Sequence, residues 1–551
     1  MDRKRLGLLA ATALAGCLAL GAPAPAQAPA HVPTERPRAV IGPPRDVVWQ
    51  QGPARPPAGK RKPNIILIVA DDLGYNDLTF AGGGSGVAGG AVPTPNIDSI
   101  GRQGVSFDQG YTGHGTCAPS RAALMTGRYP TRFGFEFTPV PLGFARSVRA
   151  FNYGIRNPVY FADREKDIIP TSEMGVPTGE IMIGKLLQDA GYHTLQFGKW
   201  HLGESPQFQP QNRGFSETLG FTPGGSMFLP PGDPRGVEAR QEFDPIDIQL
   251  WKSLQFYVRK DGGEAFAPKR YMTDYLTDEA VRAIEANRNR PFFMFMAYNA
   301  PHTPLQATKE DFEALHYIKD RRMRIYAAMI RSLDRNVGRL LQAVQEQGLE
   351  KDTIVIFTSD NGGAYYIGLP EINRPFRGWK QTFFEGGIRT PYFVRWPGTI
   401  PAGSTYHAPV SHFDIFATVA ASAGAKLPGD RVYDGVDLIP FVKGQKTGRP
   451  HETLFWRTGP YQVVRAGDWK LQVTERPAKD WLFDLSVDPT ERNNLAAANP
   501  QKVAELKALL AAHNAQQAKP MWPELGQTAV MLDHTLETPQ AESDEYVYWG
   551  N

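Results

Sequence analysis

Four short apolar runs, separated by amphipathic stretches, constrain the fold of this chain more than any other feature. They are NIILIVA (64–70), HTLQF (193–197), PFFMFMAY (291–298) and TIVIFT (353–358). Continuous apolar runs of this length are typical of strands buried on both faces, and their alternation with amphipathic segments is typical of parallel sheets covered by helices. Apolar residues from Ile325 to Val344 recur at helical spacing and predict one such helix. The sequence therefore predicts an α/β fold with a large, mostly parallel sheet sandwiched by helices.

The N-terminal segment has the layout of an export signal. A basic start, MDRKR, precedes an apolar stretch and the small residues APAPAQA, which predicts a signal peptide over residues 1–26. The sequence LAGC, ending at Cys17, also fits a lipobox, in which Cys17 would carry a lipid anchor. We expect an exported protein, periplasmic or secreted, or an outer-membrane lipoprotein if Cys17 is lipidated.

Composition and the pattern of apolar residues divide the rest of the chain into three parts. Residues 27–60 are rich in Pro and Ala and predict a linker, with order beginning at Pro63. Residues 61–450 carry the apolar runs and form the predicted catalytic domain. Residues 451–551 show short alternating strands with tight turns and then a helical stretch, which predicts a smaller C-terminal antiparallel α+β domain with a tail.

Composition excludes several classes of partner. The chain has 41% hydrophobic and 21% charged residues and a formal net charge of +3, which gives no bias toward nucleic acid or a membrane surface. No segment after the signal approaches the roughly 18 apolar residues needed to cross a bilayer. We therefore expect no nucleic-acid partner and no transmembrane span.

Charged or metal-binding side chains follow all four apolar runs, at the edge of an open α/β sheet where ligands bind. In chain order these are Asp71 and Asp72, Lys199 and His201, His302, and Asp360 and Asn361. The oxygen donors of Asp71, Asp72, Asp360 and Asn361 suit calcium or magnesium better than zinc. Taken singly, each could also be a helix cap or an Asx-turn. Two such pairs of oxygen donors at two strand ends favour a metal site.

Cationic and titratable groups accompany these oxygen donors. Lys199, His201, His302 and Lys380 are placed on the same face, and His can transfer protons near neutral pH. A metal flanked by lysines and histidines indicates an anionic substrate with a departing oxygen. The expected chemistry is cleavage of phosphate or sulfate esters.

Cys117 is the one cysteine left once residues 1–26 are removed. Most free cysteines are small buried hydrophobes, and this reading is open here. Pro119 suits the first helical position, which puts the cysteine at a helix mouth, where amide groups attract anions and lower a thiol pKa. The sequence therefore places Cys117 as a nucleophile.

The stretch CAPSRAALMTGR (117–128) resembles the signature of the type I, formylglycine-dependent sulfatases, an arylsulfatase-like family of the alkaline-phosphatase-like superfamily. IVADDLGYNDL, GYHTLQFGKWHLG, NAPHTPL, FTSDNGG and FEGGIRTPYFVRWPG are similar to further family blocks in the same order. The resemblance covers roughly residues 62–515 and implies an alkaline-phosphatase-like fold.

The resemblance also implies roles for individual residues. Cys117 would be converted to formylglycine (3-oxoalanine) by a maturation enzyme, and one calcium ion would be bound by Asp71, Asp72, Asp360, Asn361 and the modified Cys117. Arg121 would hold the formylglycine hydroxyl with Lys199 beside it. His201 would be the base, and His302 and Lys380 would bind sulfate and assist the leaving alcohol. The implied substrates are aryl or carbohydrate sulfate monoesters.

Two other functions stay open at this point. A relative on the same scaffold could cleave phosphate or phosphonate monoesters, and a protein with unmodified Cys117 could bind sulfated glycans without catalysis. His114, just before the signature, could contact substrate or serve the structure. Residues 142–177 and 203–270, rich in Gly, Pro and aromatic residues, are expected to be insertions that decide specificity.

Overall fold

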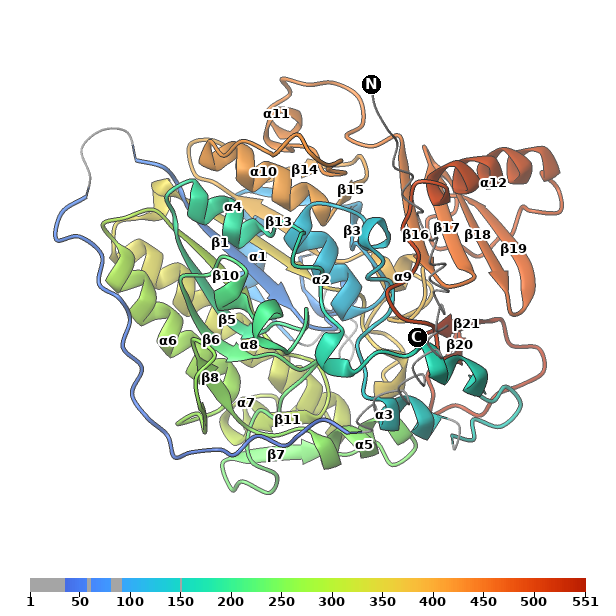
Figure 1. The fold of residues 1–551 in the computed structure, drawn as a ribbon, viewed down its shortest axis with the longest axis horizontal. Helices are drawn as coiled ribbons and strands as arrows, with labels where there is room; N and C mark the ends of the chain where they lie inside the picture. The colour runs from blue at the N-terminus through green and yellow to red at the C-terminus, as the bar shows by residue number, and fades with distance from the viewer. Residues whose placement is uncertain (1–34, 57–60, 81–91, 149–150) are drawn as a thin grey trace, which may run out of the picture.

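The computed structural model describes residues 35–56, 61–80, 92–148 and 151–551 (Figure 1). The signal peptide and Cys17 lie outside the described residues, so export stays a prediction. The main body is built on one ten-stranded sheet, with the strand order β14-β2-β13-β12-β1-β10-β5-β6-β8-β9. Among the described residues, no helix is both long and apolar enough to span a bilayer.

The centre of this sheet is parallel, as the sequence predicts. Strand β1 (Asn64–Ala70) lies between β10 (Phe292–Ala297) and β12 (Thr353–Ser359), and both pairings are parallel. The parallel region continues through β5 (His193–Lys199) to β6 (Glu217–Phe221). The carboxyl ends of the four predicted strands therefore meet at one edge.

Short strands extend the sheet on both sides. Antiparallel pairing joins β13 (Tyr392–Arg395) to β12 and to β2 (Val105–Phe107), and β14 (Ser404–Tyr406) pairs parallel to β2. On the other side β8 (Val258–Lys260) and β9 (Ala265–Phe266) are antiparallel. Two small sheets pair β7 (Gly236–Ala239) with β11 (Leu305–Thr308), and β3 (Gly110–Tyr111) with β15 (Val410–Ser411).

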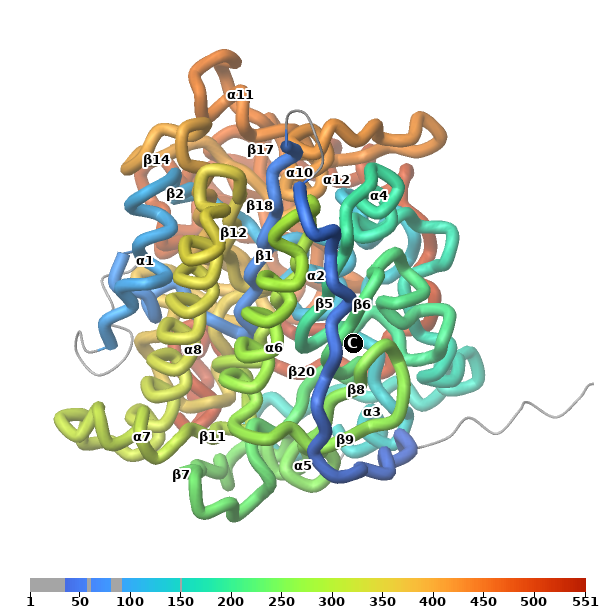
Figure 2. Tube along the Cα trace, turned by 90° about the vertical axis from the view of Figure 1, so that its left-hand side faces the viewer, coloured from blue at the N-terminus to red at the C-terminus, as the bar shows by residue number. Residues whose placement is uncertain are grey.

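Helices cover both faces because alternate residues of each central strand face opposite sides. Ile66 and Ile68 of β1 belong to the apolar cluster that includes α1 (Pro95–Arg102), α6 (Met272–Asn287) and α8 (Arg321–Glu346). Ile65 and Leu67 belong to the cluster that includes α2 (Cys117–Thr126), α4 (Ile183–Asp189) and α10 (Phe413–Ala423). Figure 2 shows α6 and α8 on one side of the sheet and α2, α4 and α10 on the other. The helix predicted from Ile325 to Val344 is confirmed as the centre of α8.

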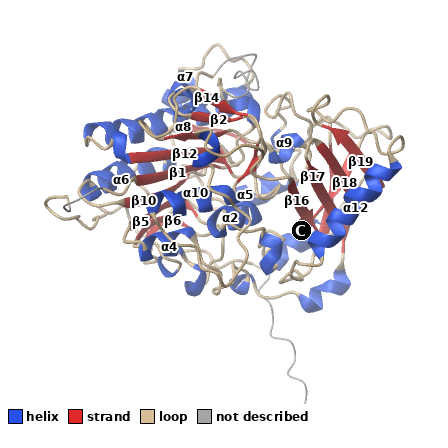
Figure 3. Ribbon diagram, turned by 90° about the horizontal axis from the view of Figure 1, so that it is seen from above, coloured by secondary structure: helices blue, strands red, loops and turns tan. Residues whose placement is uncertain are grey.

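The C-terminal region forms the expected antiparallel α+β unit, seen to one side of the main sheet in Figure 3. It is a meander of β16 (Thr453–Thr458), β17 (Tyr461–Ala466), β18 (Trp469–Glu475) and β19 (Ala478–Asp484) with α12 (Pro500–Asn514) on one face. Val464, Leu471 and Leu482 face Leu506 and Leu510 of α12. Other side chains of these strands belong to the main core, among them Trp456 and Trp481.

The tail and one predicted insertion combine into a separate sheet. Strands β20 (Gly526–Met531) and β21 (Tyr546–Gly550) pair antiparallel, and β4 (Val159–Tyr160) joins the edge of β20. The remaining helices are α3 (Leu142–Ser147), α5 (Pro245–Ser253), α7 (Lys309–Glu313), α9 (Glu385–Ile388) and α11 (Ile439–Val442).

Part of the predicted linker is packed against the main domain, so order does not begin at Pro63. Residues 35–56 run as an extended segment, and the backbone N–H of Ala39 donates to Gln255 Oε1 at 2.8 Å. The side chain of Trp49 is buried, and its indole N–H donates to Glu279 Oε2 at 3.0 Å. The buried apolar residues of this segment, such as Trp49, stand singly in a sequence rich in Pro and Ala. They form no periodic pattern, so the sequence did not indicate that the segment packs. The boundary at residue 450 stays a prediction.

Candidate active site

The carboxyl ends of β1 and β12 bring the four predicted oxygen donors together. Asp71 and Asp72 follow β1, and Asp360 and Asn361 follow β12; all four are at most 4% exposed. The backbone N–H of Asp72 donates to Asp360 Oδ1 at 3.3 Å, and Asn361 Nδ2 donates to Asp72 Oδ1 at 2.8 Å. Asp72 has a φ of +62°, a left-handed conformation that is uncommon for a non-glycine residue.

Cys117 lies directly against the acidic pair after β1. Its Sγ is 3.6 Å from Asp71 Oδ1 and 3.7 Å from Asp72 Oδ1. Cys117 is itself the first residue of α2, so the helix begins two residues earlier than the predicted start at Pro119. Burial raises the pKa of the thiol, which corrects the expectation that the helix mouth lowers it. Burial therefore favours the protonated form of an unmodified thiol, which is a poor nucleophile.

Three buried cations lie among the three carboxyl groups, and Asp71 has two of them as partners. Lys199 Nζ is 2.9 and 2.7 Å from the two oxygens of Asp71, and Lys380 Nζ is 2.8 Å from Asp72 Oδ2. The third pair joins Arg121 and Asp360, with 2.8 Å between Nε and Oδ2. The Arg121 Nη2 atom lies 3.9 Å from Asp71 Oδ1, beyond hydrogen-bond distance, and is buried without a hydrogen-bond partner. Each carboxyl group of the cluster therefore has a buried cation beside it.

The two adjacent carboxyl groups titrate differently because their neighbours differ. Burial raises the pKa of Asp71, and Asp360 adds to this effect while Lys199 opposes it. Burial acts on Asp72 in the same direction, but Lys380 and His302 hold the pKa of Asp72 below its usual range. A bound divalent cation would favour the ionised form of both groups.

Burial favours the neutral form of both His201 and His302. Burial lowers the pKa of His302 to about 3 although Asp72 opposes the shift; His302 Nε2 is 3.7 Å from Asp72 Oδ2. His302 Nδ1 faces the carbonyl oxygen of Thr303 and must donate to it, which leaves Nε2 as the acceptor of the neutral ring. Burial and then Lys199 lower the pKa of His201 well below its usual value, and its buried Nδ1 has no partner.

Sequence reasoning missed one residue of this cluster, Tyr366. Its hydroxyl donates to Asp72 Oδ2 at 3.2 Å, and Lys380 Nζ lies 5.7 Å from the centre of its ring. Tyr366 follows the SDNGG segment by only a few residues. Its position just after a strand end is a signal that could have identified it.

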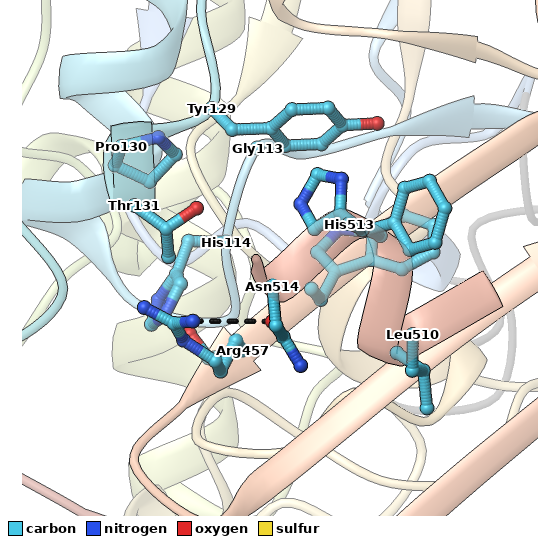
Figure 4. A pocket seen from close by; sticks show the side chains of 11 residues that line it. Gly113, His114, Tyr129, Pro130, Thr131, Arg457, Leu510, His513 and Asn514 are labelled. Atoms are coloured by element: carbon cyan, nitrogen blue, oxygen red, sulfur yellow. Dashed lines mark hydrogen bonds between the residues drawn. The ribbon is translucent and has the colours of Figure 1, made fainter. Parts of the chain in front are cut away.

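His114 serves the structure rather than the site. Its Nδ1 is 3.0 Å from Thr116 Oγ1 and its Nε2 is 3.0 Å from the carbonyl oxygen of Arg457, so both ring nitrogens have partners. The ring is 1% exposed and packs between Phe383 and Trp549. Figure 4 shows it lining a small pocket against the C-terminal unit, where Arg457 donates to Asn514 Oδ1 at 3.1 Å. Cys117 and the acidic pairs do not line this pocket.

Comparison with known proteins decides the family. The profile described as "Sulfatase" matches residues 63–425, which span the main sheet and the whole cluster around Cys117. The chain belongs to the sulfatase family. A second profile, "N-sulphoglucosamine sulphohydrolase, C-terminal", matches residues 377–518 of this sulfatase. Members of the family use a metal ion and formylglycine, and the cluster around Cys117 is the candidate site for both.

Curated relatives and solved structures agree with this assignment. N-acetylgalactosamine-6-sulfatase of Mus musculus is 35% identical over 74% of this sulfatase and 71% of the relative. Steryl-sulfatase of Mus musculus is 31% identical over 86% and 85% of the two chains. The crystal structure of Ps i-CgsB in complex with k-i-k-neocarrahexaose superposes with a TM-score of 0.68 at 32% identity, covering 84% of this sulfatase and 95% of that chain.

Proposed function

We propose that this sulfatase is an exported enzyme that hydrolyses carbohydrate or aryl sulfate monoesters, with formylglycine derived from Cys117 and one calcium ion. The observation that carries the proposal is the position of Cys117 Sγ, 3.6 and 3.7 Å from the carboxylates of Asp71 and Asp72. A residue that is modified and then works beside a metal accounts for this placement.

The residues present fit a calcium ion. Ligand atoms of Asp71, Asp72, Cys117 and His302 all lie within 4.8 Å of one another. Asn361 Oδ1 is buried without a hydrogen-bond partner, so one oxygen is free to bind a cation. Asp71, Asp72, Asp360 and Asn361 would hold the ion, and oxygen-only donors match calcium. When bound, calcium supplies a Lewis acid that polarises a sulfate oxygen.

Formylglycine at position 117 would supply, when hydrated, one hydroxyl as a nucleophile toward sulfur and a second that allows sulfate to be released. The side chains around it orient and stabilise these groups. Arg121 and Lys199 lie on the side of Asp360 and Asp71, where they stabilise negative charge on the hydroxyl and on sulfate. Lys380 approaches from the side of Asp72 and binds the sulfate oxygens.

The neutral histidines take complementary roles in proton transfer. His201, with its pKa held low by burial and nearby cations, is a proton acceptor at neutral pH and serves as the base. His302 lies beside Asp72 and assists the leaving alcohol. For His302 to act as an acid its ring must first gain a proton at Nε2, which the charge of Asp72 favours and burial opposes.

Names of relatives favour carbohydrate esters as the substrate class. One relative is named for N-acetylgalactosamine and one structure holds a carrahexaose, although another relative is named for steryl sulfate. Turnover of 4-nitrophenyl sulfate compared with the corresponding phosphate and phosphonate separates this proposal from hydrolysis of phosphorus esters. We expect the sulfate to be turned over faster by at least a hundredfold.

The mass of one peptide tests the mechanism directly. Trypsin releases residues 103–121, which contain Cys117, and the aldehyde form differs in mass from the thiol form. Protein purified from its native source should yield the aldehyde form. A peptide that is fully alkylated by iodoacetamide would contradict the mechanism and favour a protein that binds sulfated glycans without cleaving them.

A further inference from the structure

A second recess lies apart from the Cys117 cluster, between β7 with its preceding turn and the first residues of α7 and α8. It is an open groove of about 510 Å³. Three cationic side chains line it: Arg240, Lys309 and Arg321. All three residues are exposed, and we call this recess the basic groove. None of the residues proposed for catalysis lines it.

The protein compensates the charge of the basic groove only in part, through an electrostatic interaction between Arg240 and Asp247. Within the described residues, none of the three forms an ion pair with a carboxylate. The Arg240 guanidinium lies 4.5 Å from the ring centre of Trp251, and Arg321 donates to the backbone carbonyl of Glu238 at 3.3 Å. The Trp251 indole is itself fixed, because its N–H donates to Asp247 Oδ2 at 3.0 Å.

The two carboxylates that line the same groove are already occupied within the protein. Asp233 pairs with Arg235, with 2.7 Å between Oδ2 and Nη2. Glu238 Oε1 accepts from the backbone N–H of Gly232 and from Gln306 Nε2, both at 2.9 Å. Three cations line the groove against two carboxylates, of which Asp233 is paired with Arg235, so the net charge of the groove is positive and an anion is the ligand that fits it.

Two segments connect the basic groove to the catalytic cluster. The chain after His302 runs through β11 to Lys309. Gly224 lies against the ring of His201, and Gly225 lies near the ring of His302. From these glycines the chain continues to β7, which pairs antiparallel with β11. Lys309 is seven positions after His302, so their Cα atoms are at most about 25 Å apart. A polymer of several sugar units is long enough to reach across even this maximum span.

We propose that the basic groove binds anionic groups of a polysaccharide chain at the same time as one sulfate ester of that chain lies at residue 117. This inference rests on the proposed function and narrows its substrate class to polyanionic polysaccharides. Guanidinium groups bind sulfate and carboxylate through paired hydrogen bonds, and exposed cations give an attraction that salt weakens. The groove therefore contributes to KM on long substrates and not to the chemical step.

A binding assay tests the groove independently of turnover. The background is Cys117→Ala, and the probes are chondroitin sulfate and ι-carrageenan in affinity gel electrophoresis, with uncharged dextran as the blank. We expect the combined variant Arg240→Gln, Lys309→Gln and Arg321→Gln to bind the sulfated polymers at least tenfold more weakly. The loss should shrink as salt is raised.

A charge-matched control tests whether the loss of net charge alone weakens binding. Lys426 follows α10, and Lys443 and Lys446 follow α11; all three are exposed, and both helices lie at the opposite end of the molecule from β7 and β11 in Figure 1. Replacing these three by Gln lowers the net charge of +3 by the same three units. The control should bind as the unaltered protein does. Equal losses in both triple variants, no loss in the groove variant, or no retardation by either polymer would overturn the proposal.

Kinetics separate failure of the groove from failure of the proposed function. In the active enzyme, the groove variant should raise KM for the sulfated polymer at least fivefold and leave kcat/KM for 4-nitrophenyl sulfate unchanged. An enzyme that cleaves sulfate esters with identical KM values in both forms would overturn the groove alone. A protein that cleaves no sulfate ester but loses polymer binding in the groove variant would contradict the proposed function and leave the groove intact.

Discussion

Lys199 Nζ contacts both oxygens of Asp71, at 2.9 and 2.7 Å, and both side chains are fully buried. The contact joins the end of β5 to the end of β1, and β10 lies between these two strands in the sheet. Because the three strands are parallel, both charged side chains lie at the same edge of the sheet. A buried ion pair of this kind is costly to break, about 3–5 kcal/mol when one partner is removed. The cluster around Cys117 is therefore held by charges that are also available for catalysis.

Asp71→Asn should abolish calcium binding and turnover. The change removes one of three carboxylates from the proposed ligand set and leaves Lys199 without its partner. We expect calcium affinity in metal-stripped protein to fall at least a hundredfold by titration calorimetry. Asp334→Asn is the control, because Asp334 is also a buried carboxylate but caps α1 through Asn96 and Ile97. Full activity in a strong chelator would contradict the metal site.

Tyr366→Phe should weaken calcium binding and turnover moderately. The lost hydroxyl donates to Asp72 Oδ2, an oxygen that Lys380 also contacts, so we expect a loss of about tenfold, or about 1.4 kcal/mol. The adjacent Tyr365 provides a matched control, because its hydroxyl is buried without a hydrogen-bond partner. Tyr365→Phe should change neither quantity. The same effect in both variants would assign the loss to general packing.

The central sheet and the cluster were predictable because both follow from one rule of topology. Apolar runs identify buried parallel strands, and the polar residues just beyond them must converge where the strands end. Asp71, Lys199, His302 and Asp360 were found in this way. The roles assigned to them rest on the family resemblance and stay predictions.

The parts that escaped prediction depend on contacts between distant segments without periodic patterns. Strand β4 pairs with β20 through only two residue pairs, Tyr160 with Gly526 and Val159 with Gln527, across more than 360 positions. Trp49 is a single apolar anchor in a Pro-rich segment. The thiol pKa of Cys117 was predicted in the wrong direction because burial outweighs the helix terminus, and burial is a property of the folded chain.

His302→Ala should slow substrates with poor leaving groups more than those with good ones. An alcohol of high pKa needs a proton as it departs, whereas nitrophenolate leaves without one. We expect a loss of about 10²- to 10⁴-fold for an alkyl or sugar sulfate and a much smaller loss for 4-nitrophenyl sulfate. The measurement is kcat/KM across a series of sulfate esters. Equal losses across the series would remove the proposed role in leaving-group departure.

Arg377→Gln should loosen the C-terminal tail and lower activity. Arg377 is 5% exposed and holds the tail through Asp533 and Glu545, at 2.9 and 2.7 Å, three residues before Lys380. We expect faster hydrogen exchange in β20 and β21 and a free energy of unfolding lower by about 2 kcal/mol. Arg492→Gln is the control, since Arg492 pairs with the same Asp533 from an exposed position. Exposed pairs contribute at most about 1 kcal/mol.

Asp77→Asn should flatten the pH dependence of stability above neutral pH. Asp77 is fully buried, and burial raises its pKa to about 8, although hydrogen bonds from Tyr326 and Gly74 to Oδ2 oppose the shift. The folded protein therefore binds a proton that the unfolded chain has lost, and the stability gained from it disappears as pH rises through 8.

The expected size of this effect follows from the same linkage. Between pH 7 and 9 the wild-type free energy of unfolding should fall by about 1.4 kcal/mol on account of Asp77. Asparagine keeps the oxygen that accepts from Tyr326 and Gly74 and, like the protonated acid, carries no charge. Asp77→Asn should therefore lose less stability over that interval in urea titrations at each pH. Parallel curves for the two proteins would show that Asp77 is ionised in the folded state at neutral pH.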